Sequence, residues 1–171
     1  AASAGLVGSR MKVGATIGQE SAPGVSITLA AKPGTFQLAA EAAAMRHTPT
    51  ALASIREALE LMRDATNRQA HREDADFQFH LAIARAANNT YFSTAMEALK
   101  DHIAVGMRFH GVSVKRDTAG LSRVFAEHEA IATAIAAGEG ARAKELMHAH
   151  LTGSRARLFQ TSASLAALPE G

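Results

Sequence analysis

Apolar side chains recur every three or four residues over most of the chain from Phe36 onward. The segment after Pro49 places four of them on one side of a helix: Leu52, Ile55, Leu59 and Met62. The segment after Thr90 repeats the pattern with Phe92, Met96, Leu99, Ile103 and Met107. Because this spacing follows the turn of an α-helix, it predicts amphipathic helices, each with one face directed to a core.

Residues that start or stop helices divide this region into six segments. Thr48 and Pro49 supply an N-cap and a proline at the first helical position, Asn88 with Asn89 ends a later helix, and Gly138 ends another. Four of the predicted helices cover residues 37–47, 72–87, 118–137 and 139–160. The other two begin at residues 49 and 90. Six such helices with short links predict an all-α fold, an antiparallel helical bundle of about six helices around one shared interior.

The two ends of the chain do not follow this pattern. Glycines and prolines interrupt residues 1–35, so we expect an irregular, Gly-rich leader there; they are Gly5, Gly8, Gly14, Gly18, Pro23, Gly24, Pro33 and Gly34. The short apolar run over residues 25–31 could be a strand, a helical turn or a segment packed on a partner. Residues 161–171 are expected to form a frayed tail.

Composition supports a helical, unexported protein. Apolar residues make up 47% of the 171 residues, much of this alanine, whereas aromatic residues are only 5%. Cysteine is absent, which leaves histidine and carboxylate side chains as the good metal ligands. The net charge of +2 is too small to imply nucleic-acid binding, and no apolar stretch could cross a membrane. We therefore expect a cytoplasmic protein of one domain.

Four polar side chains fall on the apolar faces of three predicted helices. Asp76 and His80 are one helical turn apart and share their side with Ile83 and Ala87. His128 lies in register with apolar neighbours in the fifth helix, and His150 does so in the sixth. The sequence therefore predicts that one carboxylate and three imidazoles point inward together.

A single histidine on an apolar face is more often a core residue bonded to a backbone carbonyl than a metal ligand. Three such rings beside an aspartate are harder to explain by packing, because each buried unpaired polar group costs about 1–3 kcal/mol. One divalent metal would satisfy all four groups, with two ligands from one helix and one from each of two others. The sequence therefore predicts a central metal and ligand pocket.

The other histidines fit simpler roles. His148 should face solvent, and the rings near helix ends should be exposed or cap a helix C-terminus; these are His47, His71 and His110. His102 stays undecided. Arg108 and Arg123 could attract an anion, although a surface ion pair or simple solvation suits each of them better.

Three stretches carry a resemblance to a known family: "AAMRHTPTAL" from Ala43, "DFQFHLAIARAANN" from Asp76 and "EHEAIATAIAAGEGARAKELMHAHL" from Glu127. The chain resembles, over residues 37–158, the FCD ligand-binding domain of FadR-type members of the GntR transcription regulators. The family's metal motif falls on the same four residues, Asp76, His80, His128 and His150. The asparagine that follows the first histidine of the family motif by nine residues falls on Asn89, which would line the pocket or end the helix.

The resemblance implies that residues 36–160 form a helical domain that binds a divalent metal ion and a small organic acid effector. Zinc is the first candidate, with nickel or manganese as alternatives. It also implies a homodimer that controls a winged helix-turn-helix domain. The Gly-rich leader does not resemble such a domain, so we expect DNA binding only through a part that these 171 residues lack.

Two other functions compete with a sensor. A site with open metal positions also suits a metalloenzyme acting on small carboxylic acids, but no convincing base or nucleophile adjoins the ligands. Glu127 and Glu129 flank His128 and are expected to turn away from the inner face. The third possibility is a structural bundle whose buried histidines bind no metal. We expect a sensor and not an enzyme.

Overall fold

The computed structural model describes residues 34–98, 100–101 and 118–166, and it places six α-helices and no strand in that part of the chain. The helices are α2 (Thr35–Arg46), α3 (Pro49–Asn67), α4 (Glu73–Ala86), α5 (Thr90–Ala98), α7 (Thr118–Ala136) and α8 (Gly140–Ala166). The predicted all-α class and helical bundle are confirmed. The leader and the loop after the fourth helix lie outside the described residues, as do three apolar positions predicted to face inward, Leu99, Ile103 and Met107. Leu158 lies within the last helix, but its side chain is not described.

The helix ends follow from the residues that predicted them. The Thr48 hydroxyl accepts a hydrogen bond from the Ala51 backbone N–H at 3.2 Å and caps α3. Asn88 after α4 and Gly138 after α7 have φ values of 50° and 75°, the left-handed conformation that stops a helix. The sixth helix differs from its prediction, because α8 continues to Ala166 where a frayed tail was expected from residue 161.

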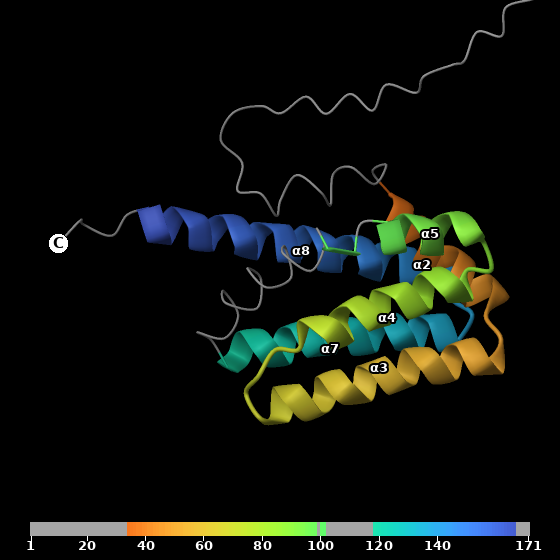
Figure 1. Ribbon diagram of the computed structural model, residues 1–171, viewed down its shortest axis with the longest axis horizontal. Coiled ribbons are helices and arrows are strands. Elements are labelled where there is room, and N and C mark those ends of the chain that lie inside the picture. The colour runs from red at the N-terminus through yellow and green to blue at the C-terminus, as the bar shows by residue number, and fades with distance from the viewer. Residues whose placement is uncertain (1–33, 99, 102–117, 167–171) are drawn as a thin grey trace, which may run out of the picture.

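Neighbouring helices run mainly antiparallel (Figure 1). The chain goes one way along α3, returns along α4, and goes back and forth again along α7 and α8. Helix α4 is buried on nearly every side, since only Gln78 and Arg85 are not buried between Ala75 and Ala86. A helix that is surrounded in this way directs most of its side chains into the interior, including the polar Asp76 and His80.

One main core fills the bundle between α2, α3, α4, α7 and α8. Its fully buried large side chains include Ile55, Phe79, Ile131, Ile135 and Met147. Three small residues of α2 face this core, so the neighbouring helices approach it closely; they are Ala40, Ala43 and Ala44. Helix α5 packs on the outer side of α4 through Met96. The described residues include no helix long and apolar enough to cross a membrane.

Candidate metal centre

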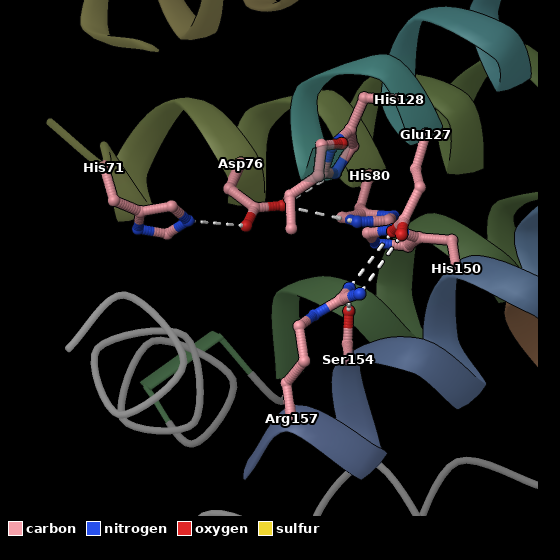
Figure 2. Close-up of polar contacts among 9 residues, drawn as sticks. His71, Asp76, His80, Glu127, His128, His150, Ser154 and Arg157 are labelled. Atoms are coloured by element: carbon pink, nitrogen blue, oxygen red, sulfur yellow. Dashed lines mark hydrogen bonds and ion pairs between the residues drawn. The ribbon is translucent and has the colours of Figure 1, made fainter. Parts of the chain in front are cut away.

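The four residues predicted to point inward meet inside the bundle. Asp76 and His80 come from α4, His128 comes from α7 and His150 from α8 (Figure 2). Each is at most 5% exposed, and His128 is completely buried. Four polar side chains on three helices thus occupy one interior site, as the helical faces predicted.

The ligand atoms of this cluster are close to one another. Asp76 Oδ1 lies 3.4 Å from Nε2 of His80 and 3.3 Å from Nε2 of His128. The rings of His80, His128 and His150 each offer a nitrogen, and these nitrogens lie within 4.8 Å of one another. Two ligands bound to one zinc-like ion at about 2.0–2.2 Å are roughly 3.0–3.5 Å apart. The separations around Asp76 Oδ1 match this spacing.

Hydrogen bonds on the outer side of two rings fix which nitrogen carries the proton. Nδ1 of His128 donates to the Val124 carbonyl at 2.8 Å, and Nδ1 of His150 donates to the Glu127 carboxylate at 2.8 Å. These acceptors have no hydrogen to offer, so Nδ1 must supply it. In the neutral ring, Nε2 is then left with a lone pair, which is the form that binds a metal.

This arrangement leaves lone pairs facing one another in the interior. Nε2 of His128 and Oδ1 of Asp76 are both buried and have no hydrogen-bond partner among the described residues, although they are 3.3 Å apart. Nδ1 of His80 is also buried without a hydrogen bond. A cation between the nitrogen and the oxygen would turn an unfavourable contact into two favourable ones, so the residues fit a divalent metal.

Comparison with known proteins identifies the family of this chain. The family model of the FCD domain matches residues 37–153, which include all four residues. The chain belongs to the FCD domain family. The resemblance described from the sequence is therefore confirmed.

Among curated proteins, the FCD domain is similar to the HTH-type transcriptional regulator LutR of Bacillus subtilis (strain 168), with 35% identity over 114 residues. That alignment covers 66% of this chain and 52% of LutR, so the chain spans about half the length of its relative.

Electrostatics keep the site of this FCD domain ready for a cation. Burial would raise the pKa of Asp76, but the neighbouring rings of His128, His71 and His80 outweigh it and hold the pKa well below its ordinary value. Burial, followed by the nearness of the His128 ring, lowers the pKa of His150 to about 3, against the opposing effect of Glu127. At neutral pH the carboxylate is therefore ionised and the His150 ring is neutral, as metal binding requires.

The prediction that Glu127 turns away from the inner face is wrong. Its carboxylate accepts the hydrogen bond from His150 and also binds the Arg157 guanidinium through two contacts of 3.1 Å. Burial would raise the pKa of Glu127, but His150 and Arg157 outweigh this effect and lower it to about 2. The side chain of Glu127 is long enough to reach α8, which packs beside it. By contrast Glu129 stays on the surface, 3.1 Å from Arg63.

The prediction for His71 is also wrong. Its side chain is only 6% exposed, and Nε2 lies 3.2 Å from Asp76 Oδ2. It precedes α4 and borders a cavity of about 20 Å³, together with Phe125 and Val124 of α7. A position outside a helix has no periodic pattern, so only its nearness to Asp76 in the sequence hinted at this contact.

The remaining predicted residues divide as follows. His148 is exposed and His47 donates from Nδ1 to the Ala43 carbonyl at the end of α2, as expected. Asn89 is exposed and accepts a hydrogen bond from the Tyr91 backbone N–H, so it ends one helix and starts the next. Arg123 is exposed. His102, Arg108 and His110 lie outside the described residues.

Proposed function

We propose that this FCD domain holds one divalent metal ion on Asp76, His80, His128 and His150 and uses it to sense a small organic acid. The observation that supports the proposal most strongly is the pair of buried, unpartnered atoms, His128 Nε2 and Asp76 Oδ1, 3.3 Å apart. Three imidazoles and one carboxylate are a donor set suited to zinc, and also to nickel or manganese.

The acid would complete the coordination of the metal. Four protein ligands leave two positions on an octahedral ion, and a carboxylate with a neighbouring hydroxyl or carbonyl group would occupy both. The charge of the metal supplies the attraction, since Asp76 and Glu127 otherwise make this interior negative. An acid that binds one arrangement of the bundle more tightly would shift the protein towards that arrangement.

We infer that the response is passed to a DNA-binding domain in a full-length regulator. The family match and the printed name of LutR, an HTH-type transcriptional regulator, support this inference. A sensor also accounts for Glu127 better than an enzyme does. The only carboxylate close to the rings besides Asp76, among the described residues, is already bonded to His150 and Arg157, so it is poorly placed to act as a base.

The test compares metal content and acid binding in three proteins. The wild type should purify with, or take up, one equivalent of divalent metal, and His128→Ala should lose it. His148→Ala is the matched control on an exposed ring and should keep it. In a thermal-shift screen, a small organic acid should raise the melting temperature of the metal-loaded wild type and of His148→Ala, and it should leave that of His128→Ala unchanged. Full metal occupancy in His128→Ala would contradict the assignment of the ligands.

A further inference from the structure

The two oxygens of the Asp76 carboxylate have different surroundings. Oδ1 faces Nε2 of His80 and of His128, at 3.4 and 3.3 Å, whereas Oδ2 lies 3.2 Å from Nε2 of His71. Figure 2 shows His71 on one side of Asp76 and the three rings of the metal cluster on the other. One oxygen is thus directed to the metal cluster and the other away from it.

The contact with His71 is a hydrogen bond of defined direction. An ionised carboxylate only accepts hydrogen bonds, so Nε2 of His71 is the donor. The pair is well shielded, since the side chains of His71 and Asp76 are each only 6% exposed. Such a bond between a buried N–H and a carboxylate is stronger than one between neutral groups.

The backbone around His71 holds the ring in this place. The chain turns after α3 through Gln69, which has a φ of 54°, and the Ala70 N–H donates to the Ala65 carbonyl at 2.8 Å. The Asp76 N–H in turn donates to the Arg72 carbonyl at 3.0 Å. The donor and acceptor side chains are therefore attached to one short, hydrogen-bonded segment that leads into α4.

We infer that His71 is a positioning residue that makes Asp76 bind its metal through Oδ1 alone. This inference rests on the proposed function. A free aspartate can bind a metal through one oxygen or through two, and the second mode uses an extra coordination position. Because His71 occupies Oδ2, that position stays open for the organic acid. His71 lies outside the three stretches that resemble the family, and it is not itself a ligand.

The test uses two substitutions that separate the N–H group from the ring. His71→Phe keeps the ring volume and removes the donor, whereas His71→Gln keeps a donor at a similar distance from the backbone. Zinc affinity is measured by competition with a chromophoric chelator, and folding is checked by circular dichroism. Loss of an outer hydrogen bond to a metal ligand costs about 10–100-fold in affinity. We expect a loss of this size in His71→Phe and recovery of most of it in His71→Gln.

The infrared spectrum reports the binding mode directly, and the wild-type protein alone is enough to test it. Zinc is added to wild-type protein carrying ¹³C-labelled aspartate carboxyls, and the apo spectrum is subtracted. A carboxylate bound through one oxygen shows a wide separation between its antisymmetric and symmetric stretches, and one bound through two shows a narrow separation. We expect the wide separation in the wild type and in His71→Gln, and a narrower one in His71→Phe if that variant folds.

Three results would overturn the inference. They are a narrow separation in the wild type, a folded His71→Phe with unchanged zinc affinity, and an equal loss in His71→Phe and His71→Gln, which would mean that a donor at this position does not support metal binding. A wild-type protein that binds neither zinc nor nickel nor manganese would instead refute the proposed function. The two failures are therefore distinguished by the wild type alone.

Discussion

Nδ1 of His150 and the carboxylate of Glu127 are joined by a 2.8 Å hydrogen bond between helices α8 and α7. Arg157 holds the same carboxylate through two contacts of 3.1 Å, and its guanidinium also donates to Ser154 at 3.0 Å. Glu127 is thus fixed from both sides, and it orients the His150 ring so that Nε2 is the atom left for a metal.

Replacing Glu127 by Gln should weaken metal binding by about 10–100-fold, because a neutral amide no longer polarises the His150 ring or balances Arg157. The dissociation constant for zinc, measured by chelator competition, checks this. Glu129→Gln is the matched control, since its side chain is half exposed and pairs with Arg63 on the surface. An equal effect of both substitutions would mean that general charge, and not the bond to His150, sets the affinity.

Acid should destabilise the metal-free domain. The pKa of His150 is about 3 in the folded protein but about 6.5 in an unfolded chain, so the unfolded state binds its proton at higher pH. The stability that depends on this difference is complete above pH 6.5 and is lost as the pH falls towards 3. The lowered pKa values of Asp76 and Glu127 add to the loss below about pH 4.5.

Urea unfolding of the chelator-treated protein at a series of pH values measures this effect. The free energy of unfolding should decrease steadily from pH 6.5 downwards, and His150→Gln should show a shallower decrease between pH 6.5 and 4.5. A wild-type protein that becomes more stable over that interval would show that the rings are not buried in their neutral form.

Truncation of Ile131 should test the core that holds the site. This side chain of α7 is completely buried in the main core, one helical turn after His128, so Ile131→Ala should lower the free energy of unfolding by about 2–5 kcal/mol. Met45→Ala, at a side chain that is 72% exposed, should change it by about 0.5 kcal/mol or less. Similar losses in the two variants would place Ile131 outside the cooperative core.

We predict that the domain is a homodimer in solution. A regulator that reads a palindromic operator needs two-fold symmetry to place its two recognition helices one turn of DNA apart. Size-exclusion chromatography with light scattering should give twice the mass of the 171-residue chain at micromolar concentration. A monomeric mass would contradict the prediction.

The site was predictable from the sequence where it follows helical periodicity. Asp76, His80, His128 and His150 lie on apolar faces of helices, and in a bundle such faces converge on one interior. The helix ends at Thr48, Asn88 and Gly138 were predictable for a similar reason, because each depends on local chemistry that is written in one or two residues.

The outer contacts of the site were not predictable in this way. Glu127 lies next to His128 in the sequence and so points in a different direction around the helix, and only the packing of α8 brings a partner within its reach. His71 belongs to the turn before α4, where the path of the backbone, and not a repeat, decides which side chain is buried. Both depend on how separate segments are arranged in space.

The distribution of the four ligands over α4, α7 and α8 has a mechanical consequence. An ion bound there would join parts of the chain as far apart as residues 76 and 150. A disulfide joins distant cysteines of a secreted protein in the same way, but this chain has no cysteine. Because such a link holds two distant parts of the chain together, it restricts the unfolded state and so favours the folded state. The metal supply of the cell would thus set how firmly the three helices hold together, in addition to what they can recognise.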